Sequence, residues 1–166
     1  MSGRLRCAGM VCALTLAAWA APVMAAFSCT VTSPGAVNFL VYNAASGTPA
    51  LASTNVTLTC NHIAGGVERI DWSMVLTNGS SGNCNARTMT GPGSSLNYNI
   101  YQNSVAGGVW GNAGCATFPA GRLRVGPGAG SGTDSTTQVL FGQIPINQFV
   151  GAGVYSDSLL LTIEYN

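Results

Sequence analysis

The chain has very little charge and almost no acid–base chemistry. Its 166 residues include one histidine, His62, and no lysine, and only 7% of them are charged. A basic stripe that could neutralise phosphates is therefore missing, which argues against a nucleic-acid partner. Histidine is the commonest general base and a frequent zinc ligand, so its scarcity disfavours an enzyme. The composition predicts no catalytic residue, no cofactor and no metal site.

Long apolar runs are also scarce, and the longest one lies at the N-terminus. A short positive start is followed by an uncharged run (residues 7–21), a proline and a small-x-small triplet ending at Ala25. This order is typical of a secretory signal peptide. The run is about 15 residues long, which is short of the roughly 20 that a membrane-spanning helix needs. We therefore expect a signal peptide over residues 1–25 and one exported domain over residues 26–166, with no membrane span.

Four cysteines follow the expected signal: Cys29, Cys60, Cys84 and Cys115. An even number of cysteines in an exported chain predicts disulfides. Three pairings are possible. The equal spacing within the first two and within the last two favours Cys29 with Cys60 and Cys84 with Cys115. No closely spaced cysteine pair or Cys/His cluster indicates zinc.

Apolar and polar residues alternate along the rest of the chain, and helical periodicity is absent. Clusters of Gly, Ser, Asn and Pro between the alternating stretches mark turns. We expect strands over 27–32, 37–42, 56–60, 70–76, 96–100, 139–144 and 159–165. About seven short strands of this kind predict an all-β, immunoglobulin-like sandwich.

The last of these strands has the clearest pattern. Leu159, Leu161, Ile163 and Tyr165 point to one side of it, and the sequence ends at Asn166. We therefore expect an apolar edge without a neighbouring strand, in a sandwich that lacks its last strand. Such an edge promotes aggregation unless something covers it. The alternative is a complete sandwich, closed by an extra pairing of residues 26–31.

Motifs for catalysis are weak. A Ser-His-Asp arrangement would have to use His62, and no GxSxG motif accompanies it. Because His62 comes after a strand and before Ala64-Gly65-Gly66, we expect it to be a solvated loop residue.

Several stretches of the chain, taken in order, resemble the spore coat protein U domain family. They are Ser28-Cys29-Thr30-Val31, Val37-Asn38-Phe39, Val56-Thr57-Leu58-Thr59-Cys60, Arg87-Thr88-Met89, Phe141-Gly142-Gln143-Ile144-Pro145 and Gly153-Val154-Tyr155-Ser156-Asp157-Ser158. Each motif is weak alone, but their order and spacing together are fairly specific. The resemblance covers essentially all of residues 26–166.

The resemblance implies a secreted structural or adhesive subunit of an archaic, Csu-type chaperone-usher pilus, or of a related surface coat. In that family a sandwich lacking its seventh strand receives one from a partner by donor-strand complementation. The partners implied are a periplasmic chaperone, an outer-membrane usher and other pilus subunits. The protein would pass through the periplasm to the cell surface, and Leu159, Leu161, Ile163 and Tyr165 would form the acceptor edge.

One feature departs from the family pattern. Polymerising subunits carry an N-terminal donor segment, whereas only Ala26, Phe27 and Ser28 stand between the expected cleavage site and Cys29. We therefore expect this chain to accept a strand and not to donate one. The alternative function is a stand-alone secreted binding module in which exposed aromatic residues such as Tyr42, Trp110 or Phe118 contact a glycan or a surface.

Overall fold

The structure, a computed structural model, describes residues 26–32, 34–115, 117–128 and 132–166. The predicted signal peptide at 1–25 lies outside the described residues. The regular elements are β1 (Phe27–Thr32), β2 (Ala50–His62), β3 (Glu68–Leu76), β4 (Arg87–Gly91), β5 (Ser94–Gln102), β6 (Ala120–Val125), β7 (Thr133–Ile144) and β8 (Leu161–Tyr165). In these parts of the chain, no helix has the length and apolar character needed to cross a membrane.

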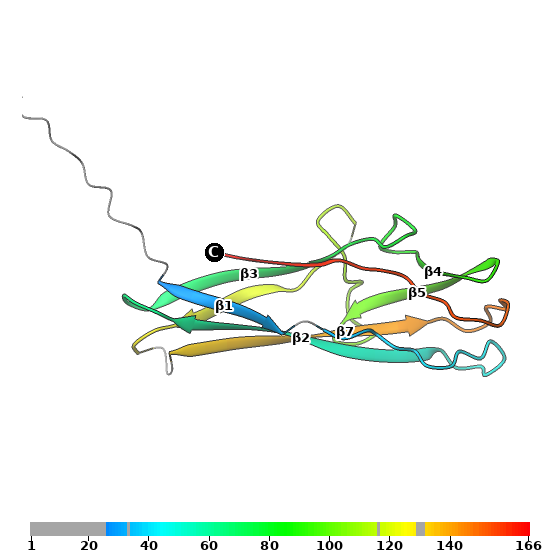
Figure 1. Cartoon of the computed structure of the whole chain (residues 1–166), viewed down its shortest axis with the longest axis horizontal. Coiled ribbons are helices and arrows are strands. Elements are labelled where there is room, and N and C mark those ends of the chain that lie inside the picture. Colours follow the sequence, from blue (N-terminus) through cyan, green and yellow to red (C-terminus); the bar gives the residue numbers. More distant parts are fainter. Residues whose placement is uncertain (1–25, 33, 116, 129–131) are drawn as a thin grey trace, which may run out of the picture.

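The strands form two antiparallel sheets. One has the order β1-β2-β7-β5-β4 and the other the order β6-β3-β8 (Figure 1). In an immunoglobulin sandwich, strands A, B, E and D share one sheet while C, F and G share the other. β1, β2, β7 and β5 take the places of A, B, E and D, and β3 and β8 take those of C and F. The all-β, immunoglobulin-like sandwich predicted from the sequence is confirmed, and no described strand stands in the place of G.

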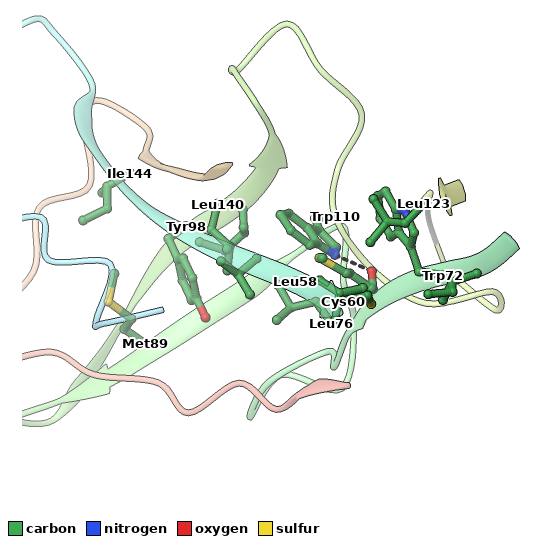
Figure 2. Close-up of a cluster of buried hydrophobic side chains, with 14 of the residues drawn as sticks. Leu58, Cys60, Trp72, Leu76, Met89, Tyr98, Trp110, Leu123, Leu140 and Ile144 are labelled. Atoms are coloured by element: carbon green, nitrogen blue, oxygen red, sulfur yellow. Dashed lines mark hydrogen bonds between the residues drawn. The ribbon is translucent and has the colours of Figure 1, made fainter. Parts of the chain in front are cut away.

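The core lies between the inner faces of the two sheets. Leu58 of β2 and Ile70 and Met74 of β3 are fully buried, as the period-2 pattern of their strands predicts. Figure 2 shows the core as a row of side chains that runs along the sandwich. Trp110 is also fully buried, and its indole N–H donates to the carbonyl of Met74 at 2.8 Å. The core therefore extends along most of the molecule.

Disulfides join Cys29 to Cys60 and Cys84 to Cys115, the pairing that the spacing favours. Cys29 and Cys60 lie directly opposite each other in the ladder between β1 and β2. This bond holds the edge strand β1 to the sheet near the start of β1.

The expected strand at 37–42 is wrong. Residues 35–42 form no strand, although Val37 and Phe39 turn inward as a strand would require. Leu40 has a φ of 56°, which turns the chain out of the extended conformation. Its N–H donates to Asn38 Oδ1 at 2.9 Å, so a local turn replaces a sheet hydrogen bond.

Two strands have no clear pattern in the sequence. β4 begins with the fully buried Arg87, a charged residue at an inward position. β6 is short and contains the exposed Arg122 and Arg124.

The expected final strand begins two residues later than predicted, at Leu161.

Candidate functional site

A long apolar groove of about 1300 Å³ opens between the two sheets. One side is the irregular segment 34–44, which we call the wall. The other side is formed by residues 150–161 and by Ile163 of β8. The floor includes Met89, Leu96, Tyr98, Ile100, Leu140 and Ile144. In Figure 1 the segment after β7, coloured orange to red, runs back along the molecule to β8 and the C-terminus.

β8 lies at the edge of its sheet, with β3 on one side only. The Thr77 N–H donates to the carbonyl of Leu160 at 3.0 Å, so Leu160 directs its backbone toward the β3 side. Backbone directions alternate along an antiparallel strand. The N–H and C=O groups of Leu161, Ile163 and Tyr165 therefore point away from β3, toward the open edge of the sheet. They offer a ladder to which an extended chain could bind.

The rims of the groove expose large apolar side chains. Leu40 and Val41 of the wall are 86% and 88% exposed, and Val154 and Leu160 on the opposite rim are 86% and 66% exposed. Single exposed apolar residues are ordinary, whereas several around one concave surface mark an interaction site. The groove is therefore the candidate functional site of the described chain.

The wall is attached at two points, to Tyr98 of β5 and to the segment that follows β7. Phe39 packs on the core, with its ring edge-on to Tyr98 at a centroid distance of 6.3 Å. The Tyr42 hydroxyl donates to the carbonyl of Pro145 at 2.9 Å and accepts the N–H of Gln148 at 3.0 Å. Leu40 and Val41 lie between these attachments. Their exposure therefore follows from a wall that is fixed on both sides of them.

The opposite side of the groove is held by residues 150–158, which we call the strap. Ser156 and Thr90 of β4 exchange two backbone hydrogen bonds of 2.9 and 3.0 Å. Tyr155 packs on Gly91, where an added Cβ would lie 2.6 Å from its ring. These contacts hold the strap against the edge of one sheet before the chain continues into β8 of the other.

Asp157 connects the strap to the floor of the groove. Its carboxylate accepts the Tyr98 hydroxyl at 2.7 Å and the N–H groups of Ser80 and Ser158 at 3.0 and 2.9 Å. Burial raises the pKa of Tyr98, and the hydrogen bond to Asp157 raises it further. Burial also tends to raise the pKa of Asp157, but the hydrogen bonds that it accepts outweigh this effect and lower it. The charged carboxylate therefore acts as a fixed acceptor at the base of the strap.

Arg87 is held inside the protein by a network of hydrogen bonds. Its side chain is fully buried and makes five hydrogen bonds, all to neutral acceptors. Two of these bonds go to the carbonyl of Thr77, at 3.2 and 2.7 Å, and one goes to Trp110 O at 2.8 Å. Burial lowers the pKa of Arg87, and the nearby Tyr98 and Asp157 oppose this shift. The guanidinium thus fixes the end of β3, where Thr77 meets the segment leading into β8.

Of the four residues predicted as an acceptor edge, Leu159, Leu161 and Ile163 line the groove, whereas Tyr165, the last residue of β8, is not among the lining residues. Leu159, Leu161 and Ile163 are partly buried against the core. Tyr165 is 43% exposed, and its ring meets that of Phe27 at a centroid distance of 6.5 Å. Their role as an acceptor edge stays a prediction.

The aromatic residues suggested for a binding module are placed differently from that expectation. Trp110 belongs to the core, and Phe118 is partly buried against it. Tyr42 is also partly buried, with its hydroxyl in hydrogen bonds. They therefore form no exposed aromatic surface.

His62 is not the solvated loop residue that we expected. It is the last residue of β2 and is partly buried, because the strand continues through it. Its Nε2 atom is buried and has no hydrogen-bond partner within the described residues. Among all the residues that the structure describes, no group of three His, Cys, Asp or Glu side chains lies together as a metal site would require.

Comparison with known families assigns the chain to a family. The sequence model of the Spore Coat Protein U domain matches residues 15–162. The chain belongs to this family. The match begins inside the predicted signal peptide and extends into β8.

A solved structure is also similar to this Spore Coat Protein U domain. It is the "CsuC-CsuE chaperone-tip adhesion subunit pre-assembly complex from archaic chaperone-usher Csu pili of Acinetobacter baumannii", in which one chain is 23% identical, with a TM-score of 0.48. The alignment covers 83% of the present chain but only 39% of that chain. No curated protein matches the sequence.

Sequence reasoning missed how the wall and strap of this Spore Coat Protein U domain are held. Phe39, Tyr155 and Asp157 all lie in motifs that support the resemblance, but their partners are far away in the sequence. Asp157 meets Tyr98 from 59 residues away, and Ser80 from 77. Only the alternation of Val37 and Phe39 indicated an inward-facing segment.

Proposed function

We propose that this Spore Coat Protein U domain is a structural or adhesive subunit of a chaperone-usher pilus, or of a related surface coat, and that its groove accepts a β-strand from a partner. The partners are a periplasmic chaperone, an outer-membrane usher and neighbouring subunits. The predicted signal peptide at residues 1–25 suits this route, because the chain has to reach the periplasm before it reaches the cell surface. Family membership supports the class of protein.

The observation that carries the acceptor role is the apolar groove along the open edge of β8. An extended chain alternates its side chains between two faces and directs its backbone groups sideways. It could therefore bond to the backbones of Leu161, Ile163 and Tyr165 while it buries every second side chain between the sheets. This is the physical basis of β-strand addition.

The wall supports the same function. Val37 and Phe39 have the inward alternation of a strand but no strand partner in the described chain. A strand bound along β8 would lie between β8 and the wall. The segment that the sequence predicts as a strand would then gain a neighbour on its groove side.

Simple energetics indicate that the occupant matters for stability. Full burial of one large apolar side chain contributes about 1.5–3 kcal/mol. A strand that covered Leu40, Val41 and Val154 and buried a few side chains of its own would contribute an amount comparable to the total stability of a domain, which is about 5–15 kcal/mol. We therefore expect the unpartnered subunit to depend on a chaperone.

The test compares three forms of the full chain, each exported to the periplasm. The first is the unextended chain. The second carries, after Asn166, a flexible linker and a designed strand of alternating valine and threonine. The third carries the same extension with serine in place of every valine, which matches its length and linker. Size-exclusion chromatography and thermal melting give the readout.

We expect only the valine strand to give a monomer, with a Tm higher by about 10 °C or more. The reason is that valine side chains can enter the groove, whereas serine side chains gain little from burial. A stable monomer without any extension, unchanged by the valine strand, would rule out the acceptor role. The sandwich would then be complete by itself.

A further inference from the structure

The wall touches the floor of the groove where β7 carries a glycine. Gly142 pairs with Ala52 of β2, so two small residues lie side by side on the inner face of the sheet. Along β7 they are flanked by the much larger inward-facing Leu140 and Ile144, which are 5% and 2% exposed. The result is a notch in an otherwise well-filled surface.

Phe39 and Val37 fill this notch. A Cβ added to Gly142 would lie 2.5 Å from Phe39 Cζ and 2.7 Å from Val37 Cγ1. Both distances are too short for real Cβ contacts, so only glycine allows the two side chains to lie this close to the β7 backbone. The Phe39 ring therefore lies where the first sheet would otherwise present a side chain toward the groove.

Phe39 is held from a second direction by Tyr98. The two rings meet edge to face at 6.3 Å, with an interplanar angle of 71°. Tyr98 is 6% exposed, and its hydroxyl is fixed by Asp157 at 2.7 Å. Phe39 thus has a backbone below it and a fixed aromatic ring beside it.

We propose that Phe39 is the register stop of the groove. This inference rests on the proposed function, since it concerns which strand the groove accepts. A side chain that reaches the floor beside Leu140 or Ile144 meets Phe39 instead when it lies above Gly142. The partner strand therefore presents a residue no larger than valine opposite Phe39, and its other inward positions accept larger apolar residues.

A stop of this kind selects register and partner together. Inward side chains recur every second residue, and each shift of two residues changes which of them lies opposite Phe39. A strand with residues larger than valine at every inward position fits in no register without overpacking. Phe39 is thus a specificity-determining residue of the acceptor groove.

The test uses the valine-strand extension described above, with one inward valine at a time replaced by phenylalanine. Each extension is attached to the unchanged chain, to Phe39→Ala and to Phe149→Ala. Phe149 is the matched control, because it is 80% exposed and does not line the groove. The Tm and the monomer fraction are measured for every combination.

In the unchanged chain we expect one position at which phenylalanine lowers the Tm by about 5 °C or more, since overpacking is destabilising. In Phe39→Ala the same position becomes the one at which phenylalanine raises the Tm most, because the added ring fills the vacated notch. Phe149→Ala repeats the pattern of the unchanged chain.

The register stop is overturned if Phe39→Ala keeps the position profile of the unchanged chain, or if Phe149→Ala alters that profile equally. Both results assume that the valine strand stabilises the chain. If no extension stabilises any of the chains, the proposed function itself fails. Should Phe39→Ala fail to fold with every extension, Phe39→Leu gives the same comparison, because it shortens the side chain and keeps it apolar.

Discussion

At the scale of single residues, the fold depends on polar side chains buried near the groove. Arg87 is the clearest example, because a fully buried guanidinium satisfies carbonyls on three separate segments. These carbonyls lie at irregular parts of the chain, where no sheet supplies their partners. The charge of Arg87 therefore serves to connect loops, and its contribution can be measured by substitution.

We expect Arg87→Met to lower the free energy of unfolding by about 3 kcal/mol or more, since buried carbonyl groups would lose their partners. Arg124→Met, which changes an exposed arginine on β6, should alter it by less than about 0.5 kcal/mol. Urea unfolding of both variants, in the monomeric chain with the valine strand, measures the difference. Equal losses would mean that the hydrogen bonds of Arg87 make no net contribution.

Asp157 predicts an acid-sensitive contribution to stability. Its folded pKa is lowered, so its contribution is complete above the unfolded value of about 4 and is lost as the pH falls through the folded pKa. We expect the Tm to fall below about pH 4, and to fall less steeply in Asp157→Asn. A full acid slope in that variant would contradict this assignment.

Asp71 provides the control for that experiment. Its hydrogen bond to Arg122 lowers its pKa as well, but both side chains are more than half exposed. Salt screens such a pair. In about 0.5 M salt we therefore expect Asp71→Asn to follow the acid profile of the unchanged chain, while Asp157→Asn still differs from it.

At the scale of secondary-structure elements, β8 differs on its two edges, and this difference is measurable by hydrogen exchange. The amides of Thr162 and Glu164 face β3, whereas those of Leu161, Ile163 and Tyr165 face the open edge. We expect the second set to exchange much faster in the unextended chain, because no strand protects them. The valine strand should slow their exchange and leave Thr162 and Glu164 little changed. Uniform protection along β8 before any strand is added would contradict the open edge.

The elements also show how far sequence reasoning extends. Alternation alone predicts β3 over most of its length, but it predicts only the second parts of β2 and β7, at 56–60 and 139–144. It does not predict β4, because Arg87 interrupts the inner face of that strand with a charge that only tertiary contacts satisfy. The prediction of a strand at 37–42 fails for the opposite reason. Its alternation is real, but a strand also needs a neighbour, and the pattern of one segment carries no information about neighbours.

The candidate site was predictable to a similar degree. The apolar face of Leu159, Leu161 and Ile163 can be read directly from the sequence. The notch at Gly142 cannot, because it depends on Ala52 being its neighbour in the sheet and on Phe39 reaching it from a separate segment. The structure adds the knowledge of which distant segments lie next to each other.

At the scale of the whole molecule, low net charge and an apolar surface concentrated around one groove both favour association between copies. The chain has a net charge of +1 at pH 7. Electrostatic repulsion between copies is therefore small. Leu40, Val41, Val154 and Leu160 expose much of their apolar surface around one groove. These properties suit the proposed role, in which a partner would cover the groove at every stage after export.

This argument predicts where self-association begins. We expect Leu40→Ser combined with Val41→Ser to increase the monomer fraction of the unextended chain, because two of the most exposed apolar side chains on the rim are removed. Phe149→Ser, which removes one similarly exposed residue outside the groove, should have a smaller effect. Light scattering over a range of concentrations measures both. In the chain with the valine strand, neither change should alter the monomer fraction, since the groove is already filled. If Phe149→Ser were the variant that restored the monomer, association would begin at the loop after β7 and not at the groove.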